Sequence, residues 1–224
     1  MLVGIICAME SEARAFGRRR GRWLGQHDYV LRVCGPGREP AASAANALIV
    51  DGCTALVSWG LAGGLDPQLQ SGAAIVSERV LTESGDVLLA DDALCTDVLS
   101  RFTAGRARRG SIVTVARAIS SAREKLAIRE RSGADAVDME STGIAYVARS
   151  ARVPFIAIRC IVDPAGFSIP PAALAGLDEH GRMRPVQVLE ALWRDSRQLP
   201  ALLELFTHYR AALATLRSLA CAIH

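Results

Sequence analysis

The chain has 224 residues, 50% of them hydrophobic and 22% charged, which is long enough for one domain with a substantial buried core. Its net charge of +3 comes from basic and acidic residues spread along the chain, and only 5% of residues are aromatic, so a nucleic-acid partner is not expected. The six cysteines are far apart and form no CxxC pairs, which indicates free thiols in a reducing compartment. The sequence contains no run of about 18 apolar residues, the length needed to span a bilayer, so we expect a cytoplasmic protein.

Short runs rich in Val, Ile and Leu alternate with segments of helical spacing. Strands are predicted at 2–7, 29–34, 55–60, 73–80, 111–116 and 154–162, and helices at 39–52, 121–133 and 140–152. Nearly continuous apolar strands that alternate with helices are typical of a parallel sheet covered on both faces. The sequence therefore predicts a single α/β domain over 1–224, with a mixed, mostly parallel central sheet flanked by helices.

The last quarter of the chain has a different pattern. Residues 164–185 lose periodicity and gather Pro and Gly, which favours a lid-like loop beside a site. Residues 186–222 are helical in period and interrupted at Pro200. They carry an apolar stripe of Leu202, Leu203, Phe206, Tyr209, Leu213 and Leu216. Docking onto the sheet is the favoured role of this stripe, and contact with a membrane surface is the alternative.

Acidic residues directly follow several predicted strands. Glu10 and Glu12 follow the first, Asp138 and Glu140 follow the run "ADAV", and Asp163 follows the last. Ligands of open α/β sheets bind at the carboxyl ends of strands, so these acids are candidate site residues. Each could instead begin a helix, an alternative that is strongest for Asp138.

Glycine-rich turns follow two of the strands, "CGPG" at 34–37 and "GLAGGLDP" at 60–67. Such turns let backbone N–H groups approach an anion or a sugar closely. The first strand is followed by "CAMESE" and not by GxGxxG, so NAD is not expected. The histidines have no metal-ligand spacing, so neither a metal nor another cofactor is expected.

Five segments together carry a family resemblance: "GIICAMESEA", "GPG", "WGLAGGLDP", "VDMESTGIAYVA" and "IRCIVD". Their order and spacing resemble those of the nucleoside phosphorylase and nucleosidase family. Over residues 1–163, the branch that the chain resembles is the methylthioadenosine/S-adenosylhomocysteine nucleosidases. The segments "LDEHGRMRP" and "LPALLELFTHYRAALATLR" are similar to the hopanoid-associated phosphorylases, thought to remove adenine from adenosylhopane. The resemblance implies a nucleoside phosphorylase-like fold and a homodimer.

The implied activity is cleavage of the N-glycosidic bond of a 5′-substituted adenosine, with release of adenine. Adenosylhopane, in hopanoid biosynthesis, is the favoured substrate, and methylthioadenosine or S-adenosylhomocysteine is the alternative. An alternative of another class is a purine-nucleoside binding module without turnover. The joint presence of Glu12, Glu140 and Asp163 favours catalysis, because a binder needs only the contacts to ribose and base.

The resemblance also assigns roles to residues. Glu12 matches the acid that activates the attacking water, with Glu10 the less favoured choice, and Asp163 matches the acid that protonates purine N7. Met139 and Glu140 match the pair that binds the ribose, with Glu140 accepting hydrogen bonds from its 2′- and 3′-hydroxyls.

The base-binding positions are Ala118 and Ile119, together with Asp163. The family presents an aromatic ring where this chain has Ala118 and Ile119. The base is therefore either held less tightly or packed by Phe167 from the lid.

The chemistry needs these residue types. Adenine leaves well only when it is protonated as the bond stretches, which a buried acid such as Asp163 can do if burial keeps it protonated. A carboxylate on the opposite face of the ribose, such as Glu12, can activate water and stabilise the cationic sugar. A site built around Glu140 would select ribosides over 2′-deoxyribosides, because it rejects analogues that lack the hydroxyl.

The nucleophile is water or phosphate. It is expected at Gly60, Leu61, Ala62 and Gly63, where Arg38 could offset the charge of an anion. The resembled hexameric phosphorylases carry a phosphate-binding arginine where this chain has Glu12. A carboxylate there repels phosphate, so water is favoured.

Aliphatic residues replace more polar or aromatic family residues at Leu61, Ala118 and Val162. One hypothesis is a 5′ pocket that accepts a large apolar substituent such as a hopane skeleton, with the protein peripheral to the inner membrane. The equal alternative is that these residues pack the core.

Overall fold

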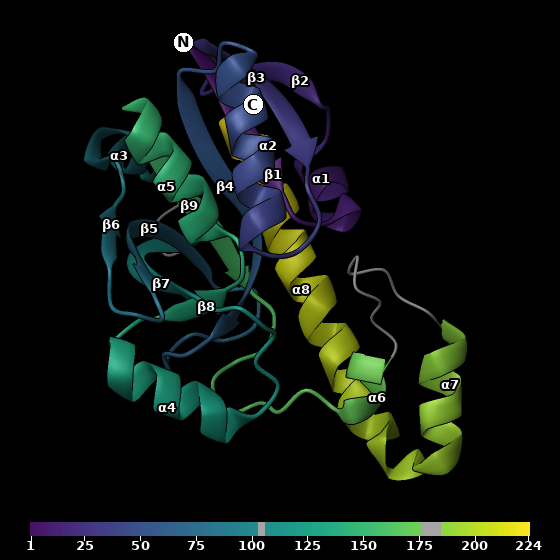
Figure 1. Cartoon of the computed structure of the whole chain (residues 1–224). Helices are drawn as coiled ribbons and strands as arrows, with labels where there is room; N and C mark the ends of the chain where they lie inside the picture. The colour runs from purple at the N-terminus through teal and green to yellow at the C-terminus, as the bar shows by residue number, and fades with distance from the viewer. Residues whose placement is uncertain (103–105, 176–184) are drawn as a thin grey trace.

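The computed structural model describes residues 1–102, 106–175 and 185–224 (Figure 1). The strands are β1 (Leu2–Cys7), β2 (Arg20–Trp23), β3 (His27–Val33), β4 (Ala55–Gly64), β5 (Ala74–Thr82), β6 (Val87–Leu89), β7 (Ala107–Thr114), β8 (Ala136–Asp138) and β9 (Phe155–Ile161). The helices are α1 (Glu10–Phe16), α2 (Arg38–Val50), α3 (Asp92–Arg101), α4 (Ala122–Ser132), α5 (Ser141–Ala151), α6 (Pro171–Ala175), α7 (Pro185–Arg194) and α8 (Leu199–Ile223). The α/β class predicted from the sequence is confirmed.

The strands form one mixed sheet in the order β2-β3-β1-β4-β8-β7-β5-β6. Strand β9 lies off this path, parallel to β4 and antiparallel to β5. Strands β4, β8, β7, β5 and β9 therefore pair in a closed ring. Closure gives both long sides of β9 a partner, and so protects this buried strand from the unpaired edge that an open sheet would leave.

Side chains along the central strands alternate between two cores because successive residues of a strand face opposite sides. In β1, Val3 and Ile5 point to the side covered by α1, α3 and the C-terminal half of α8, whereas Ile6 points to the side covered by α2 and α5. A third cluster lies under α4. All six cysteines are free thiols, as expected, and Cys221 is exposed.

Most predicted elements are present, and the elements not predicted include β2, β6, α1 and α3. Strand β2 has the sequence "RGRW", with three exposed residues at the edge of the sheet. The predicted lid at 164–185 contains the short helix α6, and its residues 176–184 lie outside the described part of the chain. The predicted interruption of the C-terminal helical segment lies just before Pro200, since α7 ends at Arg194 and α8 begins at Leu199. Pro200 itself lies in the first turn of α8, where a missing N–H costs little.

Only part of the predicted stripe on α8 docks onto the sheet. Leu216 is buried, but Leu203 and Phe206 are 59% and 58% exposed. Helix α7 and the N-terminal half of α8 extend away from the sheet in Figure 1, and Trp193 of α7 is 93% exposed. The docking expectation was therefore wrong for the N-terminal half of α8. None of the helices described here has the length and hydropathy to cross a membrane.

The contact between α2 and α5 predicts a glycine requirement. A Cβ at Gly143 would lie 2.3 Å from the backbone oxygen of Arg38. Since helix backbones cannot shift as a side-chain tip can, Gly143→Ala should lower the free energy of unfolding by about 1–3 kcal/mol. Equilibrium urea unfolding measures the change. Gly166→Ala is the control, since no atom lies within 4 Å of its added Cβ; equal stability of the two variants would contradict the prediction.

Candidate active site

The acids nominated from the sequence gather at the carboxyl ends of β1, β4, β8 and β9. Strand β4 links them: its Leu61 N–H donates to Glu12 Oε1 at 2.9 Å, and its Gly63 lies beside the Asp163 carboxyl. Glu140 follows β8 and lies 3.9 Å from the guanidinium of Arg159 in β9. Glu12, Glu140 and Asp163 thus follow strand ends in the structure, and their joint role as an active site stays a prediction.

Glu12 is held rigidly in the first turn of α1. Its Oε2 accepts the Met9 N–H at 2.9 Å while Oε1 accepts that of Leu61, and the residue is 3% exposed. Burial raises the pKa of Glu12, and the charge of Arg159 and the backbone hydrogen bonds oppose the rise. By contrast, Glu10 is exposed and pairs with Arg19. The structure therefore supports Glu12 over Glu10 as the residue that faces the site.

Gly60 permits this placement of Glu12. A Cβ at position 60 would lie 2.6 Å from Glu12 Oε1, so any other residue would displace the carboxylate. The predicted anion loop at residues 60–63 is not a loop, since these residues belong to β4. The Leu61 N–H is also unavailable to an anion, because Glu12 already accepts it.

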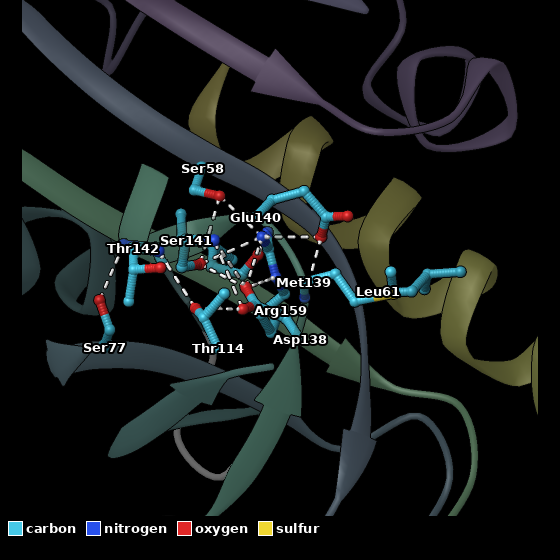
Figure 2. A network of polar contacts seen from close by, with 12 residues as sticks. Ser58, Leu61, Ser77, Thr114, Asp138, Met139, Glu140, Ser141, Thr142 and Arg159 are labelled. Atoms are coloured by element: carbon cyan, nitrogen blue, oxygen red, sulfur yellow. Dashed lines mark hydrogen bonds and ion pairs between the residues drawn. The ribbon is translucent and has the colours of Figure 1, made fainter. Parts of the chain in front are cut away.

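A buried ion pair between Arg159 and Asp138 lies at the centre of the site (Figure 2). Arg159 Nε donates to Asp138 Oδ2 at 2.9 Å, and Nη2 donates to Ser58 Oγ at 2.7 Å. Asp138 also accepts hydrogen bonds from the hydroxyls of Thr114 and Ser141. A buried pair is tolerated only when its remaining donors and acceptors are satisfied in this way.

For Asp138 the sequence favoured a role as the residue that starts a helix. It does accept the Ser141 N–H in the first turn of α5, at 3.3 and 3.4 Å to its two oxygens. Its ion pair with Arg159 was not anticipated. Asp138 thus connects the start of α5 to Arg159, whose positive charge faces Glu12 and Glu140.

Glu140 is fixed by two backbone groups and is 8% exposed. Its Oε1 accepts the Gly37 N–H at 2.9 Å, and Oε2 accepts that of Met139 at 3.3 Å. Burial, followed by the charge of Asp138, raises the pKa of Glu140 to about 7, against the opposing charge of Arg159. A carboxylate has about four acceptor sites, so lone pairs remain for two hydroxyl donors. The "GPG" turn therefore anchors the acid through Gly37.

Asp163 follows β9 and is 6% exposed. Its Oδ2 lies 2.5 Å from Lys125 Nζ, and Lys125 in α4 is completely buried. Burial raises the pKa of Asp163, and the positive charge of Lys125 lowers it in part. A carboxyl in this environment can hold a proton at higher pH than an exposed aspartate.

The remaining nominated residues have varied positions. Ala118 is exposed, and Ile119 is buried in the cluster under α4, against which the half-buried Met139 packs. Phe167 is half-buried, and the ring of His208 in α8 meets it edge to face with centroids 5.0 Å apart. Their contact with a base stays a prediction.

Arg38 does not reach the cluster of acids. The residue is exposed, and its guanidinium lies 5.7 Å from the ring centroid of Tyr146 in α5. In the described part of the chain, no ion pair or hydrogen bond joins it to Glu12 or Glu140. The cause is its position in the first turn of α2, on the side that faces α5.

Arg159 and Lys125 were not predicted from the sequence. A signal existed for each of them. Arg159 is the only charged residue in the otherwise apolar β9. The signal for Lys125 is that it is the only lysine among the 26 lysine and arginine residues of the chain. Its burial could not be predicted, because the neighbouring residues of α4 are charged.

Comparison with known proteins identifies the family of the chain. A family model described as the phosphorylase superfamily matches residues 3–183. The 5′-methylthioadenosine/S-adenosylhomocysteine nucleosidase of Tolumonas auensis is 28% identical, covering 76% of this chain and 89% of that protein. The corresponding nucleosidase of Baumannia cicadellinicola is 29% identical, covering 73% and 86%.

Two solved structures share the fold. The nucleosidase of Neisseria meningitidis in complex with methylthio-immucillin-A has a TM-score of 0.69 at 20% identity, covering 98% of this chain and 97% of that one. The native futalosine hydrolase of Helicobacter pylori has a TM-score of 0.71 at 15% identity, covering 99% and 96%.

Fold, site and relatives together define an enzyme that cleaves N-glycosidic bonds. The chain belongs to the phosphorylase superfamily.

The raised pKa of Glu140 predicts how stability depends on pH. Folding raises this pKa from 4.5 to about 7, so the folded state holds the proton more tightly than the unfolded state. The resulting stabilisation is complete below pH 4.5 and is lost as the pH rises to about 7. Glu140→Gln should therefore flatten the fall in unfolding free energy over this range, by up to about 3 kcal/mol.

Urea unfolding at several pH values between these limits measures the slope. Glu130→Gln, which removes an exposed acid from α4, is the control and should leave the slope as it is in the unsubstituted protein. An unchanged slope in Glu140→Gln would contradict the assignment.

Proposed function

We propose that this enzyme is a hydrolase that releases adenine from 5′-methylthioadenosine or S-adenosylhomocysteine. The observation that carries the proposal is the charge balance of the buried site. Glu12, Asp138 and Glu140 contribute three carboxyl groups, and Arg159 is the cation among them. Phosphate would meet these acids and a guanidinium whose donors are largely engaged, which favours water as the nucleophile.

The names of the curated relatives support the substrate class, since both are 5′-methylthioadenosine/S-adenosylhomocysteine nucleosidases. The ribose would lie against Met139 and Glu140, which accepts hydrogen bonds from its hydroxyls. Asp163, as the neutral acid, would give its proton to purine N7 while the electrons of the C1′–N9 bond move to the base. Water would add to C1′ and pass a proton to Glu12, whose two backbone hydrogen bonds fix its orientation.

Turnover tests these roles. Glu12→Gln and Asp163→Asn should each lower kcat for adenine release from methylthioadenosine by about 10²–10⁴-fold, because each removes a group that transfers a proton in the transition state. Added phosphate should not change the rate. Glu10→Gln is the matched control, since this acid lies two residues away in the same turn of α1 and is exposed.

The outcomes distinguish the parts of the proposal. Unchanged release in both variants would refute the mechanism. Strict dependence on phosphate would overturn only the choice of water.

A second candidate substrate is adenosylhopane, or another adenosine with a large apolar 5′ substituent. The specific observation is the exposed apolar surface of α7 and α8, which includes Trp193, Leu203 and Phe206. Leu61 and Val162, half-buried beside the site, pack against the same core cluster as α8. These contacts support an apolar path from the site toward α8, and core packing is the alternative role of the two residues.

Ligand-induced thermal stabilisation compares the two substrates. If the apolar path exists, an adenosine with a long 5′-alkylthio chain should raise the Tm more than methylthioadenosine does. Leu61→Ser should reduce this difference, whereas Leu126→Ser, on the exposed side of α4, should preserve it. Greater stabilisation by methylthioadenosine would contradict the second candidate.

The homodimer, the contact with a membrane surface and the cytoplasmic location next to the inner membrane stay predictions. So does phosphate as the less favoured nucleophile. A non-catalytic binding module is disfavoured by the presence of Glu12 and Asp163, since neither is needed to hold ribose or base.

A further inference from the structure

Lys125 has an unusual environment for a lysine. Its side chain is completely buried, although it belongs to a helix rich in charged residues. Its ammonium donates to the backbone oxygens of Asp163, Pro164 and Phe167 at 3.1, 2.9 and 3.0 Å. It also lies 2.5 Å from Asp163 Oδ2. One ammonium thus holds both the side chain of the proposed proton donor and the turn that follows it.

The choice of lysine matches this geometry. Of the 26 lysine and arginine residues, 25 are arginines, so position 125 is the only one of them with an ammonium side chain. A guanidinium is planar with donors in a fixed fork, whereas an ammonium is compact and directs three donors around one atom. Three converging carbonyls and a carboxylate suit the ammonium. A group that only fastened the turn would need no contact with the carboxylate.

We propose that Lys125 is a positioning residue for the proton donor, which fixes the Asp163 carboxyl through Oδ2 and sets its strength as an acid. The inference rests on the proposed function, in which Asp163 protonates purine N7. Lys125 itself gives up no proton. When the Asp163 proton moves to the base, a carboxylate remains, and the adjacent ammonium stabilises that charge.

The charges around Asp163 agree with this role. Lys125 from α4 and His208 from α8 are the groups whose positive charge lowers its pKa, against a larger rise from burial. Without Lys125, burial acts with less opposition, so Asp163 holds its proton more tightly and is a weaker acid. The alkaline limit of activity should therefore move to higher pH while the maximal rate falls.

Two substrates separate acid catalysis from other functions of the site. Methylthioadenosine needs a protonated leaving group, whereas p-nitrophenyl riboside has a leaving group that departs as an anion. In Lys125→Gln, which keeps two N–H donors for the three carbonyls but removes the charge, the ratio of kcat for methylthioadenosine to kcat for p-nitrophenyl riboside should fall at least tenfold. Lys125→Arg, which keeps a charge, should recover part of the ratio.

The alkaline limb of kcat/KM for methylthioadenosine gives a second readout, which should move to higher pH in Lys125→Gln. It is measured with His208→Gln present in both proteins, so that the imidazole does not contribute. An unchanged ratio together with an unchanged alkaline limb would overturn the proposal. Absence of adenine release by the unsubstituted protein would instead refute the proposed function.

A measurement on the unsubstituted protein keeps the test independent of whether the variants fold. Selective 15N labelling of lysine should give one Nζ resonance, since the chain has one lysine. The pairing predicts that this resonance shifts with pH along the same curve as the alkaline limb of kcat/KM. It also predicts a displaced resonance in Asp163→Asn. A resonance that responds to neither change would overturn the pairing.

Discussion

The buried ion pair between Arg159 and Asp138 is the interaction on which the site depends. Removing two charges from water is costly, and their attraction offsets that cost only when each remaining donor and acceptor finds a partner. Hydroxyls from β4, β7 and α5 provide those partners (Figure 2). The same guanidinium supplies the positive charge for Glu12 and Glu140, so the acids can lie close together in the protein interior.

The closed ring of strands explains how residues distant in sequence are held together. Strand β9 carries Arg159 and ends just before Asp163, and β4 beside it carries the glycines that allow Glu12 and Asp163 to approach. Because β9 pairs with β4 along its length and with β5 over residues 158–160, the backbone of Arg159 cannot move without breaking ladder hydrogen bonds. Rigid placement of this kind lowers the reorganisation needed during a proton transfer.

Several parts of this architecture could be predicted from the sequence, and the reasons for the others are physical. Apolar strands and helical spacing predicted the class of fold. The rule that sites follow strands nominated five acids, and the family resemblance selected Glu12, Glu140 and Asp163 among them. The position of Arg38 depends on the packing of α2 against α5, which local pattern does not encode. The role of Asp138 depends on a partner 21 residues away, and that of Lys125 on one 38 residues away.

The single lysine has a practical consequence for work on this enzyme. Its amine has no exposed surface in the folded state, and no other side chain carries a primary amine, since the remaining 25 of the 26 lysine and arginine residues are arginines. Acylation of Lys125 therefore requires α4 to separate from the turn after β9. The rate of that modification would report how often α4 separates from this turn, at one defined side chain.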